Sequence, residues 1–120
     1  MRLLICGDRN WENFSLIYKH LALEKALHDE LVVIEGGAKG ADTLGRKAAV
    51  VLGIPVLEYK AQWDRYGRAA GPVRNQEMLD VGKPDLVWAF HNDLERSKGT
   101  KDMVTRAENA GVLVEKFKEE

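Results

Sequence analysis

Short apolar runs alternate along this chain with segments in which apolar residues recur every three or four positions. Runs of the first kind cover residues 2–6, 31–35, 56–59, 85–90 and 112–117. Aliphatic and β-branched runs of this length are typical of strands that are buried on both faces. The segments between them predict helices over residues 13–28, 41–52, 71–81 and 100–110, because their apolar side chains share one helical face. Residues 60–71 are predicted to form a long loop.

This strict alternation predicts the α/β fold class, with one doubly wound parallel sheet of about five strands and helices on both faces. The chain has 120 residues, enough for one domain over residues 1–120 and too few for two ordinary ones. In such a sheet the strand-to-helix loops all emerge at the carboxyl edge, where ligands of this architecture bind. The residues of those loops are therefore the candidates for a functional site.

Capping residues mark the starts of two predicted helices. Asn13 or Ser15 is expected to cap the first helix, and Thr100 the last. The first helix is expected to bury one apolar stripe, which consists of Phe14, Ile17, Tyr18, Leu21 and Leu27.

The most distinctive loop follows the strand at residues 31–35 and carries Gly36, Gly37 and Gly40 before Asp42. Glycines between a strand and a helix allow backbone N–H groups to face an anion at a helix N-terminus. The spacing matches neither the Walker motif nor the dinucleotide fingerprint, so a turn that serves chain reversal alone is the alternative. For Asp42, capping of backbone N–H groups and contact with a ribose are equally compatible with its position.

Three other loops carry similar residues. Gly7 and Arg9 follow the first strand, and a second group opens the helix at residues 71–81. We expect all four loops to form one binding site at the carboxyl edge, with positive charge from Arg74, Lys39 and Lys98. The remaining candidates are Gly71, Asn75, Gly99 and Thr100. Asn75 is expected either to bind a ribose hydroxyl or to brace the glycine loop.

Charge and cysteine content narrow the function classes. The 18 Lys and Arg residues against 19 Asp and Glu give a formal charge of −1, which provides no global field for nucleic acid or an anionic membrane. No apolar run approaches a membrane span and no signal peptide is evident, so a cytoplasmic location is expected.

Cys6 lies in a strand and is expected to be buried and inert. The three histidines lack metal-ligand spacing, so no zinc site is predicted, while a magnesium ion carried by the ligand stays open.

The ordered motifs resemble a known family. Gly-Asp-Arg at 7–9, Gly-Gly-Ala-Lys-Gly-Ala-Asp at 36–42, Gly-Pro-x-Arg-Asn at 71–75 and Gly-Thr-x-Asp-Met at 99–103 are together similar to the YspA-like, YpsA-related branch of the SLOG superfamily. The resemblance implies a Rossmann-like fold, a nucleotide or nucleotide-derived ligand, a sensor role as one option, and a homo-oligomer. It also implies distant similarity to the Lonely Guy phosphoribohydrolases and to DprA proteins.

One departure from the phosphoribohydrolases concerns catalysis. Met103 occupies the position of their catalytic glutamate, and a thioether cannot act as a general base. Asp102 is the nearest carboxylate, so hydrolysis of an N-glycosidic bond by Asp102 with Arg74 is the enzyme hypothesis. Whether the protein turns over a substrate stays open at this point.

A third hypothesis is binding of single-stranded DNA through the basic and aromatic loop around Trp63 and Arg68. The near-neutral charge of the chain argues against it. Trp11 and Trp63 are candidates for stacking on a base, although packing is the favoured interpretation for both. We also expect a homodimer, with the helix that begins near Arg74 as the contact.

Overall fold

The computed structural model describes residues 1–119 and contains twelve elements. In chain order they are β1 (Arg2–Gly7), α1 (Phe14–Leu27), β2 (Val32–Glu35), α2 (Ala41–Val51), β3 (Val56–Glu58), α3 (Trp63–Tyr66), η1 (Gly67–Ala69), α4 (Ala70–Asp80), β4 (Leu86–Phe90), η2 (Leu94–Arg96), α5 (Gly99–Asn109) and β5 (Leu113–Phe117). Within residues 1–119, none of the helices is both long enough and apolar enough to cross a membrane.

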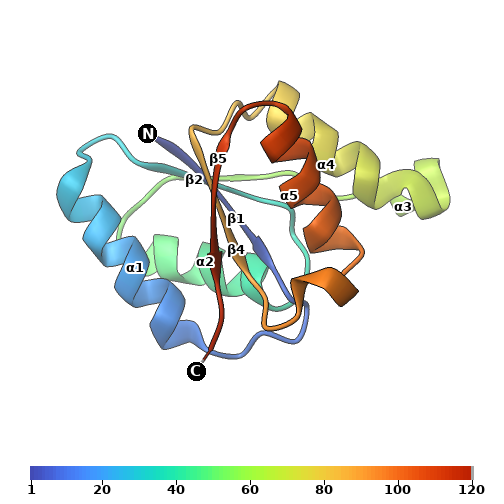
Figure 1. The fold of residues 1–120 in the computed structure, drawn as a ribbon. Helices are drawn as coiled ribbons and strands as arrows, with labels where there is room; N and C mark the ends of the chain where they lie inside the picture. The colour runs from blue at the N-terminus through green and yellow to red at the C-terminus, as the bar shows by residue number, and fades with distance from the viewer. Residues whose placement is uncertain (120) are drawn as a thin grey trace.

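The five strands form one parallel sheet in the order β3-β2-β1-β4-β5. Helices α1 and α2 contact each other on one face, and α4 and α5 contact each other on the opposite face. Figure 1 shows the sheet edge-on between these two helical layers. The predicted α/β fold with a doubly wound parallel sheet is therefore confirmed. The chain changes direction across the sheet between β1 and β4, which is the topological switch point of this architecture.

Side chains alternate between the two faces of β1, as the pleat of a strand requires. Leu3 and Ile5 belong to the core under α1 and α2, whereas Leu4 and Cys6 belong to the core under α4 and α5. The Cys6 thiol is buried and donates to the Trp88 carbonyl oxygen at 3.5 Å. Burial raises the pKa of this thiol far above its ordinary range. The predicted burial of Cys6 is therefore confirmed, and its inertness stays a prediction.

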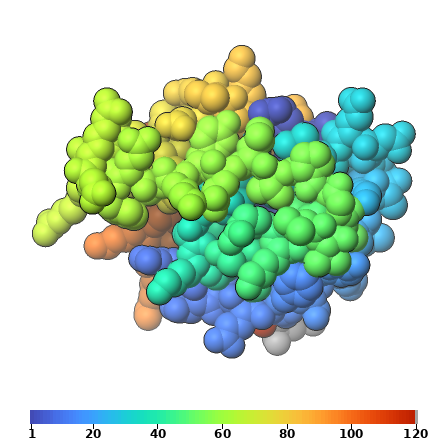
Figure 2. Space-filling view, turned by 180° about the vertical axis from the view of Figure 1, so that it is seen from behind, coloured from blue at the N-terminus to red at the C-terminus, as the bar shows by residue number. Residues whose placement is uncertain are grey.

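The predicted loop at residues 60–71 contains regular structure. The short helix α3 and the 3₁₀ turn η1 occupy most of it, and α4 begins at Ala70 rather than at Gly71. This segment projects from the body of the molecule, as the yellow-green lobe in Figure 2 shows. Trp63 is 59% exposed there, so the expected packing of this side chain is wrong.

Asn13 caps α1 as predicted, because its side chain accepts a 3.0 Å hydrogen bond from the Leu16 N–H. Two other expectations about helices need correction. Thr100 is not the cap of the last helix, because α5 begins at Gly99 and the Thr100 N–H donates to Ser97 Oγ at 3.0 Å. Leu27 does not join the buried stripe and is 75% exposed. It belongs to the last turn of α1, which the buried core no longer covers.

Candidate functional site

The carboxyl edge of the sheet brings the four glycine-marked loops together. Gly40, with φ at 75°, lies so close to the first loop that a Cβ atom would be 2.2 Å from the Asp8 carbonyl oxygen. Only glycine fits such a contact. From the other face, Arg74 of α4 reaches Gly36, and Asn75 reaches the carbonyl oxygen of Gly99. The four loops thus meet as the order of the elements predicted.

Two carboxylates of the protein itself accept the N–H groups of the loop between β2 and α2. Asp42 Oδ2 accepts from Gly36 at 3.0 Å and from Ala38 at 3.3 Å. Glu35 Oε1 accepts from the Gly37 N–H at 2.7 Å. Three consecutive donors of the loop are therefore bonded internally, and an anionic ligand would have to displace a carboxylate to reach them.

Burial dominates the electrostatics of these two carboxylates. Glu35 has no exposed surface and Asp42 is 5% exposed. Burial raises the pKa of Glu35 to about 7 and that of Asp42 to about 6, because a low dielectric disfavours the charged form. The Arg46 Nε atom lies 4.0 Å from Glu35 Oε2 and 3.9 Å from Glu58 Oε2. Among residues 1–119, neither Arg46 Nε nor Glu35 Oε2 finds a hydrogen-bond partner.

Arg74 and Asn75 connect the glycine loop to the start of α5. The Arg74 guanidinium donates through Nη1 to the Gly36 carbonyl oxygen and through Nε to Asn75 Oδ1 at 3.0 Å. Asn75 is 3% exposed, and its Nδ2 group donates to Asp102 Oδ2 at 2.9 Å. The same Asp102 oxygen accepts from Arg106 Nε at 2.9 Å. These bonds brace the site, which agrees with one of the two roles expected for Asn75.

The other candidates lie around this network or apart from it. A Cβ on Gly7 would be 2.3 Å from the Phe90 carbonyl oxygen, so the first loop is tightly seated on β4. Thr100 is buried, and Gly71 lies near the Trp63 ring rather than in the network. The solvent-exposed candidates at this edge are Arg9, Gly37, Lys39, Lys98 and Gly99. Ligand contact stays a prediction for all of them.

The aromatic candidates separate clearly. Trp11 is 3% exposed, packs on Phe90 with ring centroids 5.7 Å apart and donates to the Asn13 carbonyl oxygen, so its predicted packing is confirmed.

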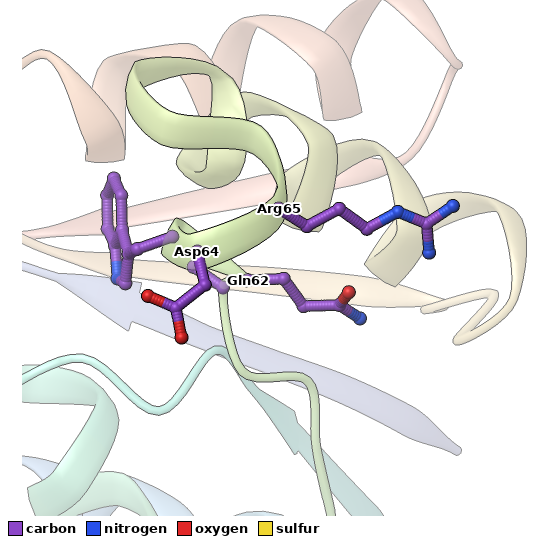
Figure 3. Close-up of a pocket in the computed structure, with 5 residues that line it drawn as sticks. Gln62, Asp64 and Arg65 are labelled. Atoms are coloured by element: carbon purple, nitrogen blue, oxygen red, sulfur yellow. The ribbon is translucent and has the colours of Figure 1, made fainter.

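A cavity of about 380 Å³ lies along residues 61–65. Figure 3 shows Gln62, Asp64 and Arg65 extending from this segment without converging on one point. A second cavity, of about 470 Å³, is lined by Asn13, Leu16, Lys19, His20, Phe117, Lys118 and Glu119.

Sequence reasoning assigned no role to Glu35, Arg46, Ser97 or His91. A charged residue that ends an otherwise apolar strand run was a usable signal for Glu35, because such a carboxylate must find donors nearby. No such signal marks His91, because the carboxylate that it faces belongs to Asp8, 83 positions earlier in the sequence. In the described part of the chain, no group of three or more His, Cys, Asp and Glu side chains is placed to hold a metal ion.

The fold and the four converging loops define a Rossmann-like α/β domain with its candidate site at the carboxyl edge. The chain belongs to the YspA, cpYpsA-related SLOG family, whose model matches residues 1–66. It is 37% identical to the gene 61 protein of Mycobacterium phage D29 over 124 aligned positions, which cover 97% of this chain and 95% of that protein.

The structural comparison supports the fold. DNA processing protein A (DprA) from Streptococcus pneumoniae matches 96% of this chain with a TM-score of 0.73 and 20% sequence identity. The chain spans about half of the DprA chain, 49%. The likeness at this identity establishes a shared fold and leaves function to the residues of the site.

Proposed function

We propose that the protein binds a nucleotide or nucleotide-derived ligand at the carboxyl edge of its sheet. The observation that carries the proposal is the braced convergence of four loops, in which Arg74 and Asn75 join the glycine loop to the start of α5. Bracing of this kind fixes loop geometry, which reduces the ordering cost of binding. The family membership supports the same class of ligand.

The internal carboxylates decide which groups would hold a phosphate. Because Glu35 and Asp42 already accept the N–H groups of the glycine loop, charge must come from side chains at the rim. Arg9, Lys39 and Lys98 are exposed cations on three of the four loops. These side chains can pair with a phosphate without displacing a buried group.

Binding is proposed ahead of turnover because Asp102 is already engaged. Its Oδ2 atom accepts from both Asn75 and Arg106, which suits a structural carboxylate better than a general base. The check is chromatography of nucleoside monophosphates incubated with the protein. If the wild-type protein released free base and Asp102→Asn did not, turnover would become the favoured function ahead of binding.

The binding proposal is tested by calorimetry against ribonucleoside monophosphates, ADP-ribose, NAD and cyclic nucleotides. We expect Lys98→Ala to weaken binding about tenfold, since a charge-assisted contact contributes roughly 1.5 kcal/mol or more. Lys47→Ala, an exposed lysine on α2, removes the same charge away from the site and serves as the matched control. Absence of heat with every compound at millimolar concentration would refute the proposal.

A second candidate is single-stranded DNA binding by the projecting segment at residues 60–69. Trp63 and Tyr66 are 59% and 37% exposed, and the Arg65 guanidinium carbon lies 5.1 Å from the Tyr66 ring centroid. Exposed aromatics beside cations can stack bases and contact phosphates. Gel shifts at low and moderate salt test this: Trp63→Ala should abolish a salt-sensitive shift, and an unshifted wild type would remove the candidate.

We also propose that the protein forms a homodimer through α4. Val73 of this helix and Val81, the residue that follows its last turn, are 37% and 60% exposed, and a domain of this size gains from covering apolar surface. Light scattering decides the matter, because the monomer mass is 13.5 kDa. A doubled mass that Val81→Glu reduces to the monomer value is expected, and a wild-type mass near 13.5 kDa would exclude the dimer.

A further inference from the structure

The topological switch point between β1 and β4 holds a carboxylate and an imidazole that face each other. Asp8 directly follows β1 and His91 directly follows β4, and the last residues of these two strands are paired in the sheet. His91 Nε2 lies 3.9 Å from Asp8 Oδ2. This distance is too long for a direct hydrogen bond, whose usual limit is about 3.2 Å.

Both side chains are held in place by their other polar atoms. His91 Nδ1 accepts the N–H of Asp93 at 2.9 Å, and Asp8 Oδ1 accepts the N–H of Asn10 at 2.9 Å. The backbones are fixed as well, because the Asp8 N–H donates to Phe90 and the His91 N–H donates to Phe117. One side-chain atom of each residue, His91 Nδ1 or Asp8 Oδ1, is therefore bonded to nearby backbone. The other atom, His91 Nε2 or Asp8 Oδ2, faces the opposite residue.

The bonding pattern sets the chemistry of the gap. Since Nδ1 accepts a backbone N–H, the neutral imidazole carries its proton on Nε2 and offers a donor. Asp8 Oδ2 offers an acceptor opposite. If an oxygen atom lay about 2.8 Å from both atoms, the angle Nε2···O···Oδ2 would be about 90°. A group that both accepts and donates a hydrogen bond can adopt this geometry.

We propose that Asp8 and His91 form a subsite for one sugar hydroxyl of the ligand, with the hydroxyl oxygen bridging Nε2 and Oδ2. The inference rests on the proposed nucleotide binding and specifies which part of the ligand this side of the site would take. The His91 side chain is 14% exposed and that of Asp8 is 29% exposed, so both can be reached from solvent. A hydroxyl is the matching class, because an anion would be repelled by Asp8 and an apolar group would leave both atoms unpaired.

The test compares ribonucleoside monophosphates with their 2′-deoxy and 3′-deoxy counterparts by calorimetry on the wild-type protein. One of the two deoxy compounds should bind about tenfold more weakly, because loss of the hydroxyl leaves the buried sides of Asp8 and His91 unpaired. Equal affinity for all three compounds would overturn the subsite while leaving the proposed function intact. Failure of all three to bind would overturn the subsite, and the proposed function would fall with it if ADP-ribose, NAD and cyclic nucleotides also gave no heat.

Two substitutions at His91 separate the bridging role from a structural one. His91→Asn keeps an acceptor at the position of Nδ1 and removes Nε2, whereas His91→Gln places a donor near the position of Nε2. The ribose preference should disappear in His91→Asn and in Asp8→Asn, and persist in His91→Gln. Preference retained in both Asp8→Asn and His91→Asn would overturn the proposal, because a purely structural pair affects all three compounds equally.

Discussion

The loop after β2 and the gap between Asp8 and His91 lie at the same edge of the sheet, yet their polar groups are used differently. In the loop, the N–H groups of Gly36, Gly37 and Ala38 are bonded to carboxylates of the protein. Across the switch point, two oriented polar atoms stand 3.9 Å apart. A glycine-rich loop therefore does not by itself identify an anion site, since the occupancy of its donors has to be known first.

The largest expected effect comes from removing the carboxylate that closes the loop. Asp42→Ala leaves the N–H groups of Gly36 and Ala38 without their acceptor, so we expect a loss of about 2–4 kcal/mol in the free energy of unfolding. Urea denaturation at pH 5 measures it, because below the Asp42 pKa of about 6 the removal of a buried charge does not offset the loss of the acceptor. Asp42→Asn retains an acceptor oxygen and should lose clearly less free energy of unfolding. Equal losses in the two variants would contradict the interpretation that Asp42 stabilises the loop by accepting these N–H groups.

The second effect concerns pH. The folded-state pKa of Glu35 is raised from 4.5 to about 7 and that of Asp42 from 3.8 to about 6. The folded protein therefore binds more protons than the unfolded chain between these values, and the stabilisation from these groups, complete below about pH 4, is lost as the pH rises through 7.

Glu35→Gln tests this dependence because glutamine stays neutral and keeps an acceptor for the Gly37 N–H. The variant should match the wild type near pH 4 and exceed its stability at pH 8, by on the order of 2 kcal/mol. Thermal unfolding at both pH values provides the measurement. A variant less stable than the wild type at pH 8 would show that the Arg46 side chain compensates the buried charge of Glu35.

A smaller effect is expected at the start of α5. Ser97 Oγ accepts the Thr100 N–H, so Ser97→Ala should cost about 1 kcal/mol of unfolding free energy, the usual contribution of a capping hydroxyl. Ser15→Ala, an exposed serine in the first turn of α1, is the control and should change stability by less than half as much. Similar values for both variants would remove the capping role of Ser97.

The smallest stability effect is expected at the exposed rim. Lys98→Ala should change the free energy of unfolding by less than about 0.5 kcal/mol, as is usual for surface substitutions, although it weakens ligand binding. Chemical denaturation and calorimetry on one preparation separate the two properties. A large loss of stability would mean that Lys98 supports the fold as well as the ligand site.

The fold was predictable because its signals are local. Short apolar strand runs alternate with segments of helical period, the first two runs end at glycines, and alternation of this kind leaves few topologies. Helix boundaries were less predictable: Ser97 and Thr100 are both good capping residues three positions apart, and their competition is decided by the path of the loop. Leu27 fits the apolar period of α1, but the period does not show where the core stops.

The site was predictable in location and only partly in detail. The order of strands cannot be derived from alternation alone, so the pairing of β1 with β4 and the meeting of Asp8 with His91 require the structure. Likewise, the spacing of Gly36 and Gly37 indicates a loop rich in donors, but the acceptors depend on where the Glu35 and Asp42 side chains turn. Such choices involve side-chain geometry across several residues, which a sequence pattern does not encode.

The buried position of Cys6, the only cysteine of the chain, makes it a natural reporter of motion. Its thiol is enclosed between the sheet and the layer of α4 and α5, so an alkylating reagent can modify it only in molecules whose layer has opened. The rate of modification at increasing denaturant would then measure how often α4 and α5 separate from the sheet. The chain thus carries its own single-site label for following breathing of the helical layer that supports Arg74 and Asn75.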